Sequence, residues 1–329
     1  MTNPSFSATE ISSLIDEKIE ILSLPAQPER LYEPIRYFLS LGGKRLRPLL
    51  ALMSYNLFSE SIDDGILPAL SIEVFHNFTL VHDDIMDKAP MRRGKDTVHK
   101  KWDNNVAILS GDAMLVKAYQ LLEQMPKEKL PMLLKAFNQT ALEVCEGQQF
   151  DMDFESRSLS SNTVTEAEYM NMIRLKTAVL FGLSFQLGGI LGNQDQSVVQ
   201  QLYNAGVKLG LAFQLQDDLL DLYGGEKFGK QVGGDILNAK KTFLLVKALE
   251  LASDEDKKQI IEIIGNKSMP DKEKIEGASE IYGRYNINEI TQAQIEGHLT
   301  EFQNSILGIN EINTNKMLEF VNSLAQRSV

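Results

Sequence analysis

The sequence predicts an all-α protein built as a bundle of ten or more helices. Ser7-x-x-Glu10 and Thr165-x-x-Glu168 are capping boxes, which begin helices. Apolar residues follow helical spacing over long stretches, most clearly over residues 66–87. No stretch alternates apolar and polar residues as a half-buried strand would. We therefore expect helices throughout.

Composition restricts the function classes. A net charge of -12 argues against a general nucleic-acid or anionic-membrane surface. No run approaches the roughly 20 apolar residues of a membrane span, and the first residues do not resemble a secretory signal. Cys145 is the only cysteine, which excludes an internal disulfide and fits a reducing compartment. We expect a soluble, cytoplasmic protein with one domain over residues 1–329, because no linker divides the chain.

Turn residues and caps delimit the expected helices. In chain order they cover residues 7–22, a segment before Gly42, 49–58, 66–87, 103–122, a segment from Pro131 to about Asp151, 165–188, 197–223 and 253–265, followed by further helical segments to residue 329. In the helix over 197–223, Gly206 and Gly210 lie one turn apart and favour close packing on a neighbour. The final segments carry no motif that indicates chemistry.

An acidic motif, Asp83-Asp84-x-x-Asp87, ends the helix over 66–87. At about 100° per residue, Asp83 and Asp87 lie on one stripe with Ile72, His76 and Thr79. Two carboxylates one turn apart repel each other, and a divalent cation relieves that repulsion. Oxygen ligands indicate a hard ion such as Mg²⁺, shared with substrate phosphates. A solvated acidic helix end is the competing interpretation of this motif alone.

A second acidic motif, FQLQDDLLD, covers residues 213–221. Asp217 and Asp221 repeat the four-residue spacing, and Gln214 lies one turn earlier. Two such helices can face each other across a cavity. Arg92 and Arg93 follow the first motif and offer guanidinium groups that bind phosphate through two donors.

These segments resemble the trans-isoprenyl diphosphate synthases, the polyprenyl synthetase family that includes the farnesyl and geranylgeranyl diphosphate synthases. The matching motifs, in the order of the family, are LGGKRLRP at 41–48, LVHDDIMDKAPMRRG at 80–94, GQQFD at 147–151, LKTA at 175–178, FQLQDDLLD at 213–221, and GKQVGGDI with NAKKT at 229–242. The resemblance implies the isoprenoid synthase-type bundle around a deep central cavity, with both acidic motifs at its mouth.

The resemblance also implies the reaction, in which isopentenyl diphosphate is condensed with an allylic diphosphate. An allylic cation forms by metal-assisted ionisation, isopentenyl diphosphate attacks it, and the released diphosphate accepts the final proton. The implied metal is Mg²⁺, with three ions per site when substrate is bound and Mn²⁺ as a substitute. The implied metal residues are Asp83, Asp87, Asp217, Asp221 and Asp235.

The resemblance assigns the remaining site residues by their place in the motifs. The diphosphate of isopentenyl diphosphate is assigned to Lys44, Arg47, His76 and Arg93. The allylic diphosphate and the developing cation are assigned to Arg92, Lys176, Thr177, Gln214, Lys230 and Lys240. The residues alone leave other interpretations open: a solvated basic helix start at 44–47, a structural His76, a lysine at 176 that only reaches water, and an ordinary surface loop over 224–235.

Product length is expected to depend on the helix that bears Asp83. The family places a floor at the fourth and fifth residues before this aspartate, here Thr79 and Phe78, and Phe75 lies one turn deeper. A small Thr79 combined with Phe78 resembles the geranylgeranyl synthases, so we expect a C20 product, with C15 or a longer chain as the alternatives. The family is commonly homodimeric.

Three other functions remain to be weighed. A terpene cyclase has no use for the GGKRLRP segment, and a silent subunit of a heteromeric synthase would lack acidic residues that are present here. The pair His82-Asp83, with His76, suggests a metal phosphohydrolase of the HD type. That function leaves the second acidic motif and the basic segments unexplained.

Overall fold

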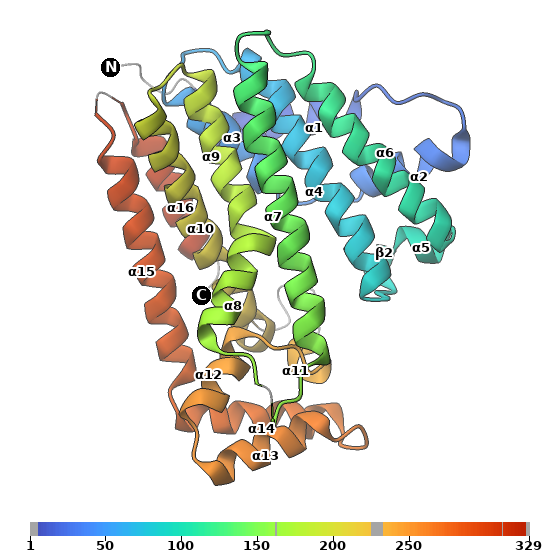
Figure 1. The fold of residues 1–329 in the computed structure, drawn as a ribbon, viewed down its shortest axis with the longest axis vertical. Helices are drawn as coiled ribbons and strands as arrows, with labels where there is room; N and C mark the ends of the chain where they lie inside the picture. The colour runs from blue at the N-terminus through green and yellow to red at the C-terminus, as the bar shows by residue number, and fades with distance from the viewer. Residues whose placement is uncertain (1–5, 162, 225–232, 311, 327–329) are drawn as a thin grey trace. The chain divides into compact units, whose positions relative to one another are not determined.

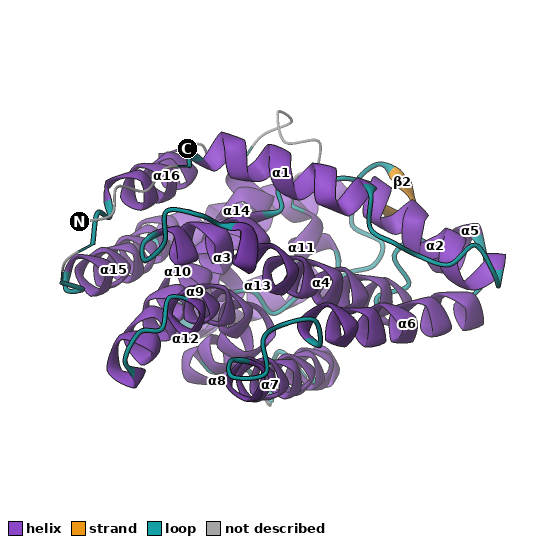
Figure 2. Cartoon of the chain, turned by 90° about the horizontal axis from the view of Figure 1, so that it is seen from above, coloured by secondary structure: helices purple, strands orange, loops and turns teal. Residues whose placement is uncertain are grey.

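The computed structural model describes residues 6–161, 163–224, 233–310 and 312–326. Its elements are α1 (Ala8–Glu20), α2 (Glu29–Ser40), α3 (Leu46–Asn56), η1 (Asp63–Gly65), α4 (Ile66–Met86), β1 (Met91–Arg92), β2 (Lys95–Asp96), α5 (Val98–Lys101), α6 (Asn104–Leu122), α7 (Leu130–Ser156), α8 (Glu166–Ile173), η2 (Arg174–Ala178), α9 (Val179–Leu191), α10 (Gln196–Tyr223), α11 (Gly234–Leu237), α12 (Phe243–Leu251), α13 (Asp254–Gly265), α14 (Asp271–Arg284), α15 (Ile287–Leu307) and α16 (Asn315–Gln326) (Figure 1). Helices dominate (Figure 2), which confirms the all-α prediction.

Among the described residues, strands are confined to one small hairpin, in which β1 pairs with β2 in antiparallel register. Arg93 and Gly94 form its turn with φ values of 53° and 73°. Positive φ at both central residues is the condition of a type I′ turn, whose twist matches that of the flanking strands. The sequence analysis did not predict this hairpin, because strands of two residues are too short to alternate.

The chain divides into two compact units. Unit 1 comprises Met1–Phe137, Leu183–Gln200 and Ile309–Met317, and unit 2 comprises Asn138–Gly182, Gln201–Gly308 and Leu318–Val329. The predicted single domain over residues 1–329 stays a prediction. Across the described residues, no helix combines the length and apolar character that a membrane span requires.

Unit 1 is organised around α4, which packs along α6 and against α3 (Figure 1). The α4 residues Ile72, Val74 and Phe75 are buried in its core. At Gly111 of α6, an added Cβ would lie 2.3 Å from Nε2 of His82, so a larger residue there would displace this side chain. The helix that bears the first acidic motif thus packs closely on α6.

In unit 2, α10 packs closely on the segment that contains η2. An added Cβ at Gly206 would lie 2.5 Å from the Phe181 carbonyl oxygen, and one at Gly210 would lie 2.6 Å from Cα of Ala178. The predicted packing role of both glycines is confirmed. The C-terminal helices, which carry no motif, contribute Ile287 of α15 and other buried side chains to the core of this unit.

Helix starts were predicted more accurately than helix ends. Both capping boxes form, with Ser7 and Thr165 as the capping residues. The helix expected to end at about 151 continues to Ser156, and the helix expected over 165–188 is three consecutive elements, α8, η2 and α9. The η2 element is a π-helical turn, a feature that often occurs at functional sites.

Candidate active site

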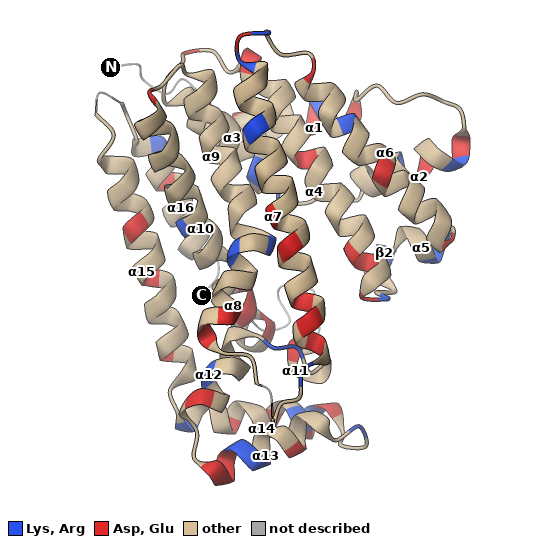
Figure 3. Cartoon of the chain, viewed as in Figure 1, with Lys and Arg blue, Asp and Glu red and all other residues tan. Residues whose placement is uncertain are grey.

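The first acidic motif lies at the end of α4, in unit 1. The helix ends at Met86, and Asp87 follows in right-handed helical conformation with its N–H donating to the Asp83 carbonyl at 2.8 Å. Helical geometry therefore persists through Asp87 and keeps Asp83 and Asp87 on one face. Figure 3 shows acidic residues in red at this end of α4.

The middle residue of the motif, Asp84, has a different environment. It is buried, and its carboxylate accepts hydrogen bonds from Nε of Arg92 at 2.9 and 3.0 Å, with Nη2 at 2.8 Å. Burial raises the pKa of the Asp84 carboxyl, while the Arg92 guanidinium acts in the opposite direction. Asp84 thus holds Arg92, which the sequence analysis assigned to the allylic diphosphate.

The first turn of α3 brings Arg47 to α4. Nη1 of Arg47 lies 3.0 Å from Nε2 of His76. Removal from water, together with the neighbouring cations Arg47, Arg93, Arg92 and Arg45, lowers the pKa of His76 well below its ordinary value of 6.5. The ring is therefore neutral. Because a guanidinium only donates, Nε2 accepts and the ring proton lies on Nδ1.

Lys44 does not share the helix with Arg47, contrary to the expectation that both lie at its start. Leu46 is the first helical residue, and Lys44 is exposed in the preceding turn. Removal from water lowers the pKa of Arg47 to about 10, which leaves it charged at neutral pH. Lys44 is therefore exposed outside the helix, whereas Arg47 is held within it.

A cavity of about 570 Å³ opens beside Arg93 in unit 1. It is lined by Tyr37, Ser40, Leu41, Arg93, Gly94, Lys95, Asp96 and Lys101. Nη1 of Arg93 donates to the Gly42 carbonyl, and an added Cβ at Gly43, whose φ is 138°, would lie 2.8 Å from Arg93 Nη2. Three cations against one carboxylate make this cavity suited to an anion.

The second acidic motif lies near the end of α10, in unit 2. Asp221 accepts a hydrogen bond at Oδ2 from the Asp235 N–H at 2.9 Å, and its carbonyl accepts from the Gly233 N–H at 2.7 Å. Nζ of Lys240 lies 3.7 Å from Oδ1 of Asp235. Desolvation opposes the charge of Lys240, but Asp235 and the other nearby carboxylates outweigh it and raise the pKa of Lys240. The predicted residues Asp221, Asp235 and Lys240 thus come together.

Asp218, the middle residue of the second motif, is buried among neutral donors. It accepts from the Tyr169 hydroxyl, from the Phe243 N–H at 3.1 Å and from Nε2 of Gln214 at 3.1 Å. The hydroxyl of Thr177 donates to Oε1 of Gln214 at 3.0 Å. Burial is the main cause that raises the pKa of Asp218, to about 7. Gln214 and Thr177 are therefore oriented by one continuous network.

Lys176 projects from the π-helical turn toward α7. Its Nζ donates to Oδ2 of Asp151 at 2.5 Å. At Gly147 of α7 an added Cβ would lie 2.2 Å from the Lys176 backbone nitrogen, so glycine allows α7 to contact η2 directly. The motifs GQQFD and LKTA, which lie about 25 residues apart in sequence, thus pack directly against each other.

A profile described as polyprenyl synthetase matches residues 28–282, a range that contains every motif named above. The chain belongs to the polyprenyl synthetase family. It is therefore an enzyme, a prenyltransferase, as the motifs predicted.

Named relatives of this synthase agree with that placement. A geranylgeranyl pyrophosphate synthase from Geoglobus acetivorans is 44% identical over 241 residues, covering 73% of this chain and 74% of its own. A short chain isoprenyl diphosphate synthase from Methanocaldococcus jannaschii is 39% identical, with 81% and 80% covered. A solved geranylgeranyl pyrophosphate synthase superposes with a TM-score of 0.89 at 41% identity, covering 96% and 97%. The isoprenoid synthase fold is thereby confirmed.

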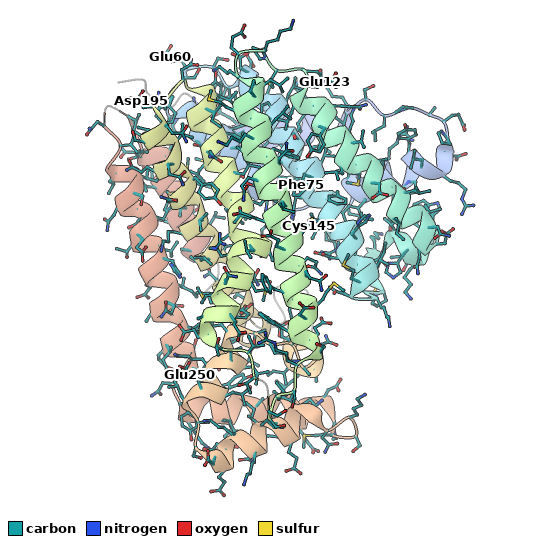
Figure 4. The ribbon with its side chains drawn as sticks, in the orientation of Figure 1. Glu60, Phe75, Glu123, Cys145, Asp195 and Glu250 are labelled. Atoms are coloured by element: carbon teal, nitrogen blue, oxygen red, sulfur yellow. The ribbon has the colours of Figure 1, made fainter. Side chains whose placement is uncertain are left out.

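Aromatic rings of the synthase surround the predicted chain-length residues. Phe75, labelled in Figure 4, is buried, and its ring centroid lies 5.6 Å from that of Phe78 and 5.2 Å from that of Phe137 on α7. Tyr119 of α6 extends the cluster, 5.1 Å from Phe137. The Thr79 hydroxyl donates to the His76 carbonyl at 2.8 Å. Helix α4 thus carries two rings in contact, of which Phe75 also packs on α7 and Phe78 on His82 of the same helix.

Sequence reasoning missed several residues that shape the site of the synthase. Asp84 and Asp218 belong to the acidic motifs, but the sequence did not predict that each is buried and bonded to its own surroundings. Gly147 could have been noticed as a glycine within a helix, whereas Tyr169 gave no signal. Lys230 lies outside the described residues.

Proposed function

We propose that this prenyltransferase condenses isopentenyl diphosphate with allylic diphosphates, one C5 unit at a time, and releases geranylgeranyl diphosphate, C20. The observation that carries the product length is the pair of rings, Phe75 and Phe78, on the helix that bears Asp83, with a small Thr79 nearer the motif. A growing chain passes Thr79 and stops at the rings. The relatives named as geranylgeranyl synthases support the same length.

We propose Mg²⁺ as the metal, held by the outer aspartates of the two motifs, Asp83, Asp87, Asp217 and Asp221, with Asp235 beside Asp221. In the described part of the chain no three histidine, cysteine or acidic side chains form a ligand cluster by themselves. Two carboxylates on one helix face nevertheless fit Mg²⁺, which keeps waters and takes the rest of its ligands from substrate phosphates. When bound, the metal would neutralise the charge that develops on the leaving diphosphate.

Residues of the chain complete the ionisation step. Arg92 is oriented by Asp84, and Lys176 and Lys240 supply further positive charge for the leaving diphosphate, as the family motifs imply. Gln214 and Thr177 present oriented dipoles to the allylic cation, and fixed dipoles stabilise developing charge without reorganisation. The bond from C1 to the diphosphate oxygen breaks, and both electrons leave with the diphosphate.

The second substrate is assigned to unit 1. We propose that Arg47, Lys44 and Arg93 bind the diphosphate of isopentenyl diphosphate, with the Nδ1–H of neutral His76 as a further donor. Arg93 also lines the net positive cavity described above, which is suited to an anion. The double bond of isopentenyl diphosphate attacks the allylic cation. The diphosphate released from the allylic substrate then accepts the proton that the product loses, so no protein base is needed.

We propose a homodimer that functions in the cytoplasm. On α6, Ile108, Leu109 and Val116 are 42%, 59% and 57% exposed, and an apolar face of this kind is favoured in water when a second copy covers it. The single cysteine fits a reducing compartment. Sedimentation equilibrium of the wild type and of Leu109→Glu tests the assembly, and equal masses for the two would reject this interface.

The central experiment measures the products. The protein is incubated with Mg²⁺, radiolabelled isopentenyl diphosphate and, in turn, dimethylallyl, geranyl and farnesyl diphosphate, and the products are sized after removal of the diphosphate. All three primers should lead to C20. Accumulation of C15 or of chains beyond C20 would reject the proposed length, and inorganic phosphate without a longer prenyl product would support a phosphohydrolase.

A further inference from the structure

Arg45 lies in the middle of the basic segment Lys44-Arg45-Leu46-Arg47, yet it is not available to bind an anion. Its side chain is 3% exposed, whereas Lys44 is exposed. Its φ of 45° lies in the left-handed region, which is unfavourable for residues other than glycine. A charge in the interior requires a partner of opposite charge, and the unfavourable backbone must be held by the contacts around it.

That partner is Glu73 of α4. Nη1 of Arg45 lies 2.5 Å from Oε1 of Glu73, whose side chain is also 3% exposed. Nη2 of Arg45 donates to the Leu39 carbonyl at 2.6 Å, at the end of α2. A second carboxylate is more distant and exposed: Oδ1 of Asp16 on α1 lies 3.8 Å from Nε of Arg45. One guanidinium therefore joins the basic segment to α2 and α4 and lies near α1.

Glu73 is itself held in place. The side-chain amide of Asn77 donates to Oε1 of Glu73 at 2.7 Å and to the Glu73 carbonyl at 2.7 Å. Glu73 precedes His76 by three residues on α4, so the Arg45 contact lies one turn from the point where Arg47 meets His76. The two contacts, Arg45 to Glu73 and Arg47 to His76, fix the start of α3 on α4 at two adjacent turns.

We propose that Arg45 and Glu73 are positioning residues for the isopentenyl diphosphate subsite. Their buried pair sets the place of Lys44 and Arg47 relative to His76, and neither residue contacts the substrate. A buried ion pair often adds little stability compared with apolar side chains of similar size, and a defined geometry is the best-supported reason to have one. The inference rests on the proposed role of Lys44, Arg47 and His76.

Two substitutions test the pair. Glu73→Gln keeps the size of the side chain and removes the charge, and Arg45→Lys keeps the charge and removes the second donor group. In both variants KM for isopentenyl diphosphate should rise by on the order of tenfold or more. Glu73→Gln leaves the buried charge of Arg45 without its closest partner, and Arg45→Lys loses the hydrogen bond to the Leu39 carbonyl that fixes the segment on α2. KM for farnesyl diphosphate and kcat at saturation of both substrates should change much less.

Arg30→Gln is the matched control. Arg30 pairs with Asp103 at 2.8 Å, but the two side chains are 72% and 48% exposed, and the pair has no role in the proposed subsite. Both KM values should stay at the wild-type level in this variant. A purely structural role of Arg45 would instead give equal losses for both substrates together with a lower melting temperature, and that result would overturn the inference.

A second readout separates this inference from the proposed function. Arg47→Ala removes a proposed ligand directly, so its KM for isopentenyl diphosphate must rise if the subsite is correctly assigned. If Arg47→Ala has this effect and Glu73→Gln does not, the positioning role is wrong. If neither variant changes this KM, the assignment of the subsite is wrong.

Discussion

The two acidic motifs share the sequence pattern DDxxD, but the second aspartate of each, Asp84 or Asp218, has different partners. In each, the outer aspartates share one helix face, while the middle residue points about 100° away into its own unit. Asp84 meets the charged Arg92, and Asp218 meets the neutral groups of Tyr169, Gln214 and the Phe243 backbone. Two motifs of the same sequence pattern therefore organise their surroundings by different means.

The outer aspartates should show the largest effect. Asp83→Asn and Asp217→Asn keep the shape of the side chain but remove the charge of a proposed metal ligand, so kcat should fall by orders of magnitude in each. Steady-state kinetics at saturating Mg²⁺ measures this. Asp195→Asn, at an exposed position outside both motifs, is the control. Unchanged turnover in both test variants would mean that neither motif holds the metal.

The middle aspartates should differ from each other in stability. Asp84→Asn leaves Arg92 without its charged partner and should lower the free energy of unfolding by about 2 kcal/mol or more. Asp218→Asn keeps an acceptor for Tyr169 and the Phe243 N–H, so its loss should be closer to about 1 kcal/mol. Urea denaturation of both variants gives the comparison, and the reverse order would show that the partner's charge is not what distinguishes the motifs.

Substitutions of the basic residues test whether isopentenyl diphosphate and the allylic diphosphate bind at separate sites. Arg47→Ala and Lys44→Ala should chiefly raise KM for isopentenyl diphosphate, with a larger effect for Arg47, which is fixed on His76, than for the exposed Lys44. A rise in KM restricted to the allylic substrate would mean that the two diphosphate sites are exchanged.

Much of the fold could be predicted because its signals are local. Capping boxes and the first acidic motif act within one or two turns, and the one-turn spacing of Gly206 and Gly210 is visible within α10 itself. The contacts of Arg45 with Glu73 and of Tyr169 with Asp218 could not be predicted, since they join residues 28 and 49 positions apart. The π-helical turn at Lys176 was also missed, because no local pattern distinguishes it from an α-helix.

The helices that bear the motifs differ again before their first aspartate. Helix α4 has Phe78 and Phe75, whose rings lie one turn apart and contact each other. Helix α10 has a single ring one turn before its first aspartate, Phe213, which packs 5.3 Å from Phe181, and its Gly210 and Gly206 pack on a neighbouring backbone. The proposed floor is the ring pair of α4. Phe78→Ala should lengthen the product by at least one C5 unit, as measured by product sizing.

Two further variants sharpen the placement of the floor. If Phe75→Ala lengthens the product and Phe78→Ala does not, the floor lies one turn deeper, where Phe137 supports Phe75. Phe185→Ala, which removes another fully buried ring of the same unit, should lower stability without changing product length.

The smallest expected effect is on the pH dependence of stability, through His76 and the cations around it. Desolvation and the adjacent arginines hold the pKa of His76 well below 6.5 in the folded chain, while the unfolded chain titrates near 6.5. The unfolded state then binds more protons below that pH, so this contribution to stability is complete above about pH 6.5 and is lost as the pH falls.

The variant His76→Gln tests this, because glutamine does not titrate. Between pH 7 and pH 5 the wild type should lose more stability than the variant, and the difference should be below about 1.4 kcal/mol per pH unit. Added salt should reduce the difference only in part, because desolvation, its largest cause, is not screened. Parallel stability curves for the two proteins would show that His76 titrates normally, and would remove the neutral donor from the proposed subsite.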